Sequence, residues 1–258
     1  MIPNGIFFYG AGGLYSYYLG IAMYLQENYD LKNVSFGGLS GGSIAAVALS
    51  AELMTKNSFD DFIRPCLKSI RDSNINNSIF GELFSNSLFG PNGLNGLKPK
   101  LGSIIEESGK FPEINKKTSI LVTKVKGIYS EGDYISHWDS VSDLMECVVT
   151  SCWIPFVFGN ATHTFRDKEC VDGGMSFILP DNRNYPDEEH NWIPISLNTF
   201  RNFSNNGIGF VLHSSLLSLS LCADDGYVKY LIDMGYEDAK NNKDYFNKLT
   251  LLKKKLVN

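Results

Sequence analysis

Three glycine-bearing loops constrain the fold of this chain most strongly, because each follows a short run that has the pattern of a buried strand. The loops are GAGG at 10–13, GLSGG at 38–42 and DGG at 172–174. Parallel strands of an open α/β sheet end along one edge, and ligands bind at that edge. We therefore expect the three loops to face one crevice.

The first 55 residues alternate between strand and helix patterns. Residues 6–9 are a short apolar run, and residues 15–29 carry apolar side chains at helical spacing. Residues 34–36 predict a second strand that ends on a glycine pair, and residues 42–54 predict a small, apolar helix packed on a sheet. This β-α-β-α order predicts an α/β fold with parallel strands and helices on the faces of the sheet.

The later segments extend this pattern with helices and shorter strands. We expect helices at 97–107, at 139–151 and from Asp224 onward, and strands at 118–132 and 170–171. Residues 72–99 are rich in Asn, Ser and Gly, so they predict a loop with short helices, either a lid or an entry surface. This segment carries the aromatic side chains of Phe80, Phe84 and Phe89. They are expected either to contact lipid or to form core beneath the loop.

Composition narrows the classes of function. The 258 residues carry a net charge of −5 without a basic stripe, which argues against a nucleic-acid partner. Five scattered cysteines argue against a disulfide framework and a zinc site, and favour a reducing compartment. We expect one domain at 1–245 and a basic tail at 246–258. The basic tail predicts a solvated helix end or, alternatively, a contact with a membrane surface.

Two apolar segments bear on localisation. The N-terminal MIPNGIFFYG has no basic residues ahead of its apolar run, so we expect no signal peptide. Residues 207–222 are short for a membrane span and are interrupted by His213 and four serines, so we expect them in the core. The protein is expected to be cytoplasmic, with any membrane contact made from outside the bilayer.

The middle loop has the sequence of a nucleophile elbow. In a strand–G-x-S-x-G–helix segment the serine occupies a sharp, strained turn, and the glycines remove side chains that would clash. Ser40 is then the nucleophile, and the N–H of Gly41, at the start of the following helix, is one donor to an oxyanion. The competing interpretation is a glycine-rich turn with an idle serine.

The first loop admits two interpretations. Gly10 and Gly12 after a strand resemble the start of a dinucleotide fingerprint, but its third glycine would fall at Tyr15. Alternatively, the backbone N–H groups of residues 10–13 complete an oxyanion hole with Gly41. The second interpretation is preferred because it accounts for two loops together.

The base that would activate Ser40 is either a histidine or an aspartate. His190 or His213 would complete a Ser–Asp–His order, but neither these two nor His137 and His163 lie in a glycine-flanked loop at a strand end. Asp172 ends a predicted strand, where it could reach Ser40 directly, and burial would raise its pKa toward that of a useful base. An ordinary Asp-Gly turn is the alternative for this segment.

Several segments together resemble the patatin-like phospholipase family, in the manner of animal adipose triglyceride lipase and its relatives: FFYGAGGLYSYYLGIAMYLQE, GLSGGSIAA, TSCWIPFVFG and VDGGMSFILP. The resemblance spans residues 5–240. It implies a three-layer α/β/α sandwich and hydrolysis of phospholipid or glycerolipid esters by a Ser–Asp dyad without a cofactor or metal. Carried over by position, Ser40 is the nucleophile and Asp172 the base, and Gly10, Ala11, Gly12 and Gly13 form the oxyanion loop.

The chain departs from the family pattern at two positions. Ala11 interrupts the glycines of the oxyanion loop and no basic residue follows, as in the adipose-lipase branch. Ile178 stands where relatives often have Asn, so a polar group that would hold the Asp172 loop is missing. A catalytically silent lipid-binding protein on the same fold and an acyltransferase that uses the same serine therefore remain alternatives.

Overall fold

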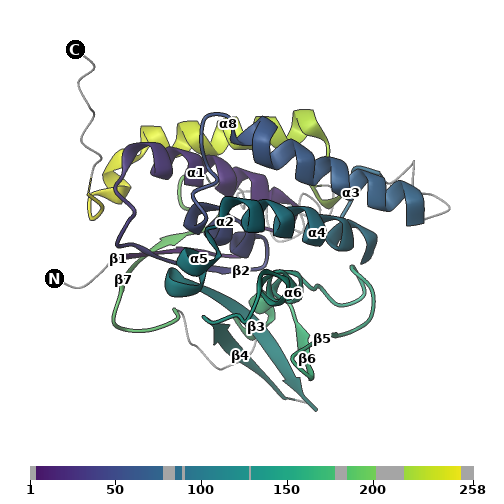
Figure 1. The fold of residues 1–258 in the computed structure, drawn as a ribbon. Coiled ribbons are helices and arrows are strands. Elements are labelled where there is room, and N and C mark those ends of the chain that lie inside the picture. The colour runs from purple at the N-terminus through teal and green to yellow at the C-terminus, as the bar shows by residue number, and fades with distance from the viewer. Residues whose placement is uncertain are drawn as a thin grey trace.

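In the described residues of the computed structural model, seven strands form one mixed sheet at the centre of the fold (Figure 1). The structure describes residues 4–77, 85–88, 91–127, 129–177, 185–201 and 218–250. Four strands pair in parallel in the order β3 (Thr118–Lys126), β2 (Ser35–Leu39), β1 (Asn4–Phe8) and β7 (Asn191–Ile195). Antiparallel strands complete the sheet beside β3: β4 (Tyr129–Ile135), β6 (Lys168–Val171) and β5 (His163–Phe165).

Helices flank this sheet. They are α1 (Tyr15–Asn28), α2 (Gly41–Ser50), α3 (Arg64–Asn77), α4 (Pro91–Ser108), α5 (Phe111–Lys117), α6 (Val141–Ser151) and α8 (Asp225–Asn241). Shorter helical turns are η1 (Gly12–Leu14), η2 (Phe59–Ile63), η3 (Gly173–Phe177) and η4 (Lys243–Phe246). The predicted α/β fold, with a mostly parallel central sheet flanked by helices, is confirmed.

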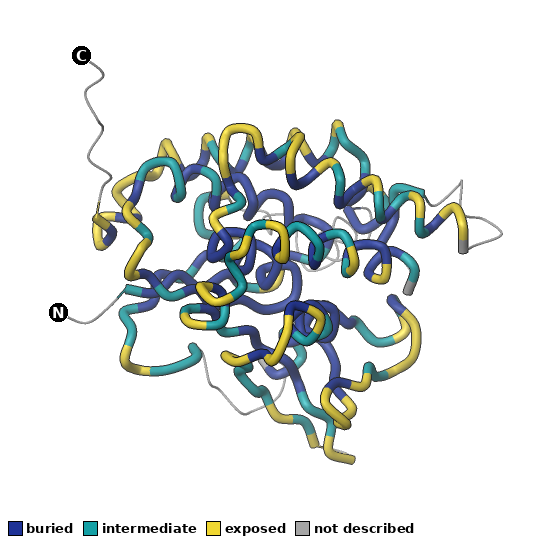
Figure 2. Tube along the Cα trace, in the orientation of Figure 1, coloured by how far each residue is buried: buried dark blue, intermediate teal, exposed yellow. Residues whose placement is uncertain are grey.

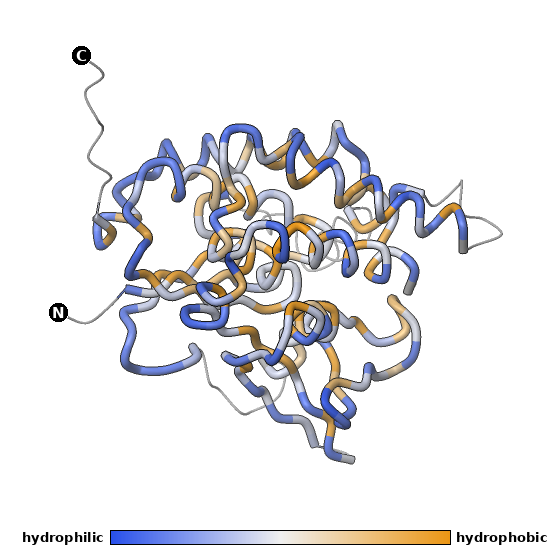
Figure 3. The backbone as a smooth tube through the Cα atoms, in the orientation of Figure 1, coloured by the Kyte–Doolittle hydropathy of each residue, from blue (hydrophilic) through white to orange (hydrophobic). Residues whose placement is uncertain are grey.

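The strand β1 shows how alternation divides the core. Ile6 and Phe8 are fully buried in the large cluster that includes α1, α2 and α6. Phe7 points to the other face, where it packs with Leu39, Leu121 and Trp192. The buried segments run through the middle of the molecule in Figure 2, and Figure 3 shows that the same strands are among the most hydrophobic segments.

Helices α1 and α8 pack at backbone distance. A Cβ on Gly20 would lie 2.0 Å from the Ile232 carbonyl oxygen, and a Cβ on Gly235 would lie 2.0 Å from the Tyr17 carbonyl oxygen. The Tyr17 hydroxyl also donates to the buried Asp238 carboxylate over 2.9 Å. The close approach covers α1, so the loop that precedes it has a rigid support.

Two expectations differ from the structure. The strand β2 continues through both glycines to Leu39, because Phe7 fills the space that a side chain at Gly37 would need. Much of the segment 72–99, expected as a loop with short helices, belongs to α3 and α4. The helix α3 continues because Leu67, Ile70 and Asn74 are buried at helical spacing.

Several other expectations concern residues outside the described ranges. They concern the phenylalanines Phe80, Phe84 and Phe89, together with Ile178, His213 and residues 251–258 of the basic tail. Most of the segment 207–222 also lies outside the described ranges. Within the described part of the chain, no helix is both long enough and apolar enough to cross a membrane.

Candidate active site

Ser40 occupies a strained turn between β2 and α2. Its backbone lies at φ 51° and ψ −136°, a conformation that residues other than glycine seldom adopt. The flanking glycines make the turn sterically possible. A Cβ on Gly42 would lie 2.4 Å from the carbonyl oxygens of Phe8 and Tyr9, and one on Gly38 would lie 2.6 Å from the Gly42 carbonyl oxygen.

Buried hydroxyl groups hold this strained backbone. The Ser40 N–H donates to Ser151 Oγ over 2.9 Å, and Ser151 Oγ donates to the Leu121 carbonyl over 2.7 Å. The β2–β3 pairing ends at Leu39 and Leu121, so Ser151 links the next residue of β2 to the sheet. On the other side, Ser43 donates its N–H and its hydroxyl to the Ser40 carbonyl.

Asp172 follows β6 and is fixed by its own backbone. Its N–H donates to the Trp153 carbonyl over 2.8 Å, and its carbonyl accepts from Thr123 Oγ1 over 2.9 Å. The segment 151–153 at the end of α6 thus holds both residues, Ser40 through the Ser151 hydroxyl and Asp172 through the Trp153 carbonyl. One rigid connection sets their relative position.

The Asp172 carboxylate is buried and only partly satisfied. The side chain accepts the Gly174 N–H at Oδ1 over 2.7 Å, while Oδ2 has no hydrogen-bond partner among the described residues. Burial raises the pKa of Asp172 to about 6, although the neighbouring Ser40 hydroxyl and the Gly174 N–H both lower it. The result is a carboxylate beside Ser40 whose pKa is suited to a general base near neutral pH.

The loop at 10–13 lies against the elbow. Gly12 has a φ of +52°, and a Cβ added to Gly41 would lie 3.0 Å from the Gly12 carbonyl oxygen and 3.4 Å from the Ala11 Cβ. A Cβ on Gly10 would lie 3.6 Å from the Ser40 Cβ. The structure therefore brings Gly10, Ala11, Gly12 and Gly41 together around Ser40, and Gly13 packs against the backbone of Ser218 and Leu219.

A narrow apolar pocket opens beside Ser40. Its cavity volume is about 20 Å³, which leaves room for about one water molecule. Gly12, Ser40 and Gly41 form its polar end. Its other walls carry no charge: Tyr15, Ile44, Leu88, Leu94, Cys152, Ile154, Phe158 and Leu219. Such a lining suits a hydrocarbon chain.

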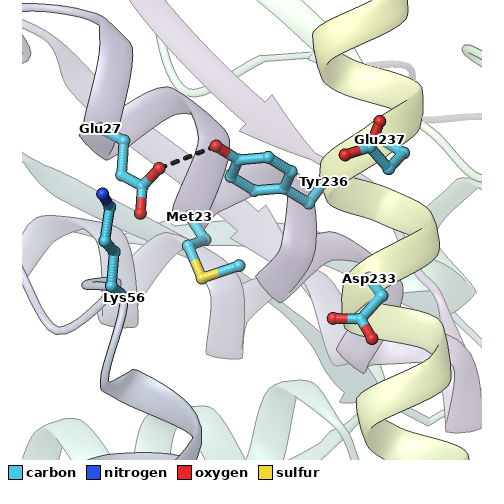
Figure 4. Close-up of a pocket in the computed structure, with 6 residues that line it drawn as sticks. All are labelled: Met23, Glu27, Lys56, Asp233, Tyr236 and Glu237. Carbon is cyan, nitrogen blue, oxygen red and sulfur yellow. Dashed lines mark hydrogen bonds between the residues drawn. The ribbon is translucent and has the colours of Figure 1, made fainter.

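A larger hollow between α1 and α8 has a different character (Figure 4). It measures about 330 Å³ and presents the carboxylates of Glu27, Asp233 and Glu237. Each of these has a partner on α8: Tyr236 donates to Glu27, Lys229 pairs with Asp233, and Lys240 pairs with Glu237. The carboxylates are thus paired at the surface, and the residues that line the hollow include no serine, threonine or cysteine.

The described histidines stand away from Ser40. His163 pairs with Glu146 over 2.6 Å and packs against the ring of Trp153. His137 is exposed near Asp139. His190 bonds to Ser35, at the opposite end of β2 from Ser40. Of the described candidate bases, Asp172 alone lies beside the elbow.

Sequence reasoning did not identify Ser151 and Thr123 as parts of the site. Ser151 lies within TSCWIPFVFG, which indicated only the family, and Thr123 is one of several β-branched residues in a strand. Their roles depend on contacts between distant segments, which no local pattern encodes. In the described residues, no group of three or more His, Cys, Asp or Glu side chains is placed to hold a metal ion.

Comparisons with known proteins place this geometry in context. The family model of the patatin-like phospholipases matches residues 6–180. Among solved structures, the crystal structure of VipD from Legionella pneumophila is similar, with 16% identity and a TM-score of 0.41. That match covers 76% of this chain and spans about half the length of the VipD chain. No curated protein matches the sequence.

Proposed function

Because the chain belongs to the patatin-like phospholipase family, we propose that it is a serine lipid acyl hydrolase of the phospholipase A or acylglycerol lipase type. The observation that carries the proposal is the strained Ser40 beside the buried, partly unsatisfied Asp172. Both features cost folding free energy, roughly 1–3 kcal/mol each. A protein that only bound lipid would have no use for them, which argues against the silent lipid-binding alternative.

The proposed reaction proceeds through an acyl-enzyme. Asp172 takes the proton of the Ser40 hydroxyl while Oγ attacks the carbonyl carbon of the ester. The C–O bond to the leaving alcohol then breaks, and the alcohol takes the proton from Asp172. Water, deprotonated by Asp172, attacks the acyl carbonyl carbon. The bond between that carbon and Ser40 Oγ breaks, Oγ takes the proton back from Asp172, and the fatty acid leaves. No histidine and no cofactor takes part.

The oxyanion is proposed to be held by backbone N–H groups. Gly41 supplies one from the first turn of α2, where the helix dipole also favours negative charge. The loop of Gly10, Ala11, Gly12 and Gly13 supplies the others. Each donor in such a hole contributes about 3–4 kcal/mol to transition-state stabilisation. This loop, with Ala11 and no basic residue after it, also supports placing the chain near the adipose-lipase branch.

An exposed side chain near the pocket supports catalysis at a lipid surface. Ile154 and Phe158 line the pocket, and between them Phe156 is 81% exposed with a φ of 62°. A phenylalanine held in this strained conformation and directed into solvent suits peripheral contact with a bilayer or a lipid droplet. The substrate acyl chain would then pass from the lipid into the apolar pocket.

Fatty-acid release from a substrate panel tests the proposed function. The panel comprises phospholipid vesicles, acylglycerol emulsions and a short chromogenic ester, with and without an acceptor alcohol that would reveal acyl transfer. Ser40→Ala should lose at least a thousandfold in rate on every phospholipid or acylglycerol cleaved by the unmodified protein. Ser50→Ala is the control, because Ser50 is also a buried serine but its hydroxyl accepts a hydrogen bond from Thr118 and does not contact the elbow. Full activity in Ser40→Ala would refute the proposal.

A further inference from the structure

A second serine of this protein has the side-chain partners of an activated nucleophile. Ser35 Oγ lies 2.8 Å from His190 Nε2, and His190 Nδ1 lies 2.8 Å from Asp187 Oδ1. These are the distances of a nucleophile, a base and a carboxylate that orients the base. The three residues form a continuous hydrogen-bonded chain at the amino end of β2.

The tautomer of His190 follows from its partners. Asp187 Oδ1 also accepts the backbone N–H groups of Glu189 and His190, each over 2.9 Å. Burial would raise the pKa of Asp187, but these bonds and the His190 side chain outweigh it, so the pKa lies below its ordinary value. An ionised carboxylate can only accept, so His190 Nδ1 carries the proton. Nε2 is then left to accept the Ser35 hydroxyl proton.

The surroundings of Ser35 indicate which compounds could reach it. Ser35, His190 and Asp187 are all partly exposed. The ring of Trp192 lies 5.4 Å from that of His190 and stacks on Tyr185, so an aromatic wall stands beside the histidine. The Trp192 ring has room at this place because Gly5 of β1, which pairs with Ser35, has no side chain.

We propose that Ser35, His190 and Asp187 form a second reactive site, which accepts acyl groups from small, activated aryl or alkyl esters. Ser35 Oγ attacks the ester carbonyl and its proton passes to His190 Nε2. The bond to the leaving alcohol breaks, and the alcohol takes that proton. An acyl-serine remains until water, deprotonated by His190, attacks the acyl carbon. The bond from that carbon to Ser35 Oγ then breaks, Oγ takes the proton from His190, and the carboxylic acid leaves. This site is separate from Ser40, which lies at the other end of β2, about 16 Å away.

Acylation by p-nitrophenyl acetate tests the proposal in a Ser40→Ala protein, where the first site is silent. Peptide mass spectrometry should find an acetyl group on Ser35. Its rate of formation should fall at least tenfold with His190→Gln and with Asp187→Asn. His163→Gln is the matched control, because His163 also pairs with a carboxylate but contacts no serine hydroxyl in the structure. It should leave the rate unchanged.

Two results would overturn the proposal. One is a folded Ser40→Ala protein that gains no acetyl group on Ser35. The other is equal acetylation of Ser35 after either His190→Gln or Asp187→Asn, which would make the hydrogen bonds purely structural. Thermal unfolding verifies each variant, and if His190→Gln does not fold, the Asp187→Asn protein decides the matter.

Discussion

The two ends of β2 carry two serines that are prepared for chemistry in different ways. Ser35 lies in regular strand geometry and has a histidine and an aspartate beside it. Ser40 has no described histidine partner, but it has a strained backbone, a following helix, a glycine loop and a buried aspartate with an unpaired oxygen. The surroundings of Ser35 are reactive through side chains, whereas those of Ser40 differ mainly in backbone conformation and in burial.

The difference teaches that a list of reactive residue types is a poor guide to the main site. The Ser–His–Asp chain at Ser35 has the more familiar composition, yet the described groups there include no glycine loop or helix start against the serine. The Ser40 end adds the elements that we propose stabilise developing negative charge, and such stabilisation is commonly the largest single contribution to catalysis. We therefore propose that Ser40 carries lipid hydrolysis and that Ser35 is acylated more slowly.

Asp172→Asn gives the largest expected effect apart from loss of Ser40 itself. An amide cannot take the serine proton, so fatty-acid release should fall by roughly a thousandfold or more. His190→Gln should leave the same rate within twofold if the two ends of β2 work independently. Initial rates on one acylglycerol emulsion measure both variants. A large loss in His190→Gln with an unchanged rate in Asp172→Asn would assign hydrolysis to the Ser35 end of β2.

The same Asp172→Asn variant should be more stable at neutral pH. The folded pKa of about 6 lies above the ordinary value of 3.8 for an aspartate, so the folded protein binds this proton more tightly than the unfolded chain. Stability therefore falls as pH rises from about 4 to about 6, by at most about 3 kcal/mol. The gain from Asn should be present at pH 7 and shrink toward pH 4. Urea unfolding at both pH values measures it, and a destabilised variant at pH 7 would contradict the argument.

Ser151→Ala tests whether the backbone of Ser40 needs its support. The change leaves a buried N–H unpaired, which costs about 1–3 kcal/mol, so kcat should fall roughly tenfold to a hundredfold while KM stays nearly constant. Ser151→Thr keeps the hydroxyl and should recover part of the rate. A similar loss of kcat in Ser50→Ala would mean that the effect is general destabilisation.

The pH dependence of hydrolysis distinguishes the base at Ser40. With an Asp172 pKa of about 6, kcat/KM should rise about tenfold per pH unit below that value and level off above it. An uncharged acylglycerol keeps substrate ionisation out of the profile. Disappearance of this limb in His190→Gln, with Asp172 intact, would assign the titration to the histidine.

Phe156→Ser gives the smallest expected loss of activity. Removing an exposed ring beside the pocket should weaken lipid contact and lower the rate on vesicles or emulsions several-fold. The rate on a short, soluble ester should stay the same, because the change does not reach Ser40. Equal losses on both kinds of substrate would show that Phe156 supports the pocket and not the contact with lipid.

The sequence predicted the parts of the fold that local pattern encodes. The strand–loop–helix order around residues 10–13 and 38–42 predicted the parallel centre of the sheet. The same pattern did not reveal that α3 continues to Asn77, because its polar surface obscures the buried Leu67, Ile70 and Asn74. The end of β2 was equally hard to predict, because a glycine pair is typical of a strand end, whereas Gly37 lies within β2, where the Phe7 ring fills the space of a side chain.

The candidate site was predictable to the extent that it consists of glycine loops. The loop containing Ser40 and the loop containing Asp172 follow their strands in the sequence, and both strands meet β3 in the sheet. The supports were not predictable, because Ser151 and Trp153 reach these loops from a helix end more than a hundred residues after Ser40. The pairing of His190 with Ser35 is likewise a contact over 155 residues.

The most direct test measures fatty-acid release by a variant in which all four histidines are replaced by glutamine, beside Asp172→Asn and the unmodified protein. Circular dichroism and thermal unfolding first establish that each protein is folded. The Ser40–Asp172 account predicts that the histidine-free protein keeps most of its activity and that Asp172→Asn loses nearly all of it. A folded histidine-free protein without activity, together with an active Asp172→Asn, would contradict it.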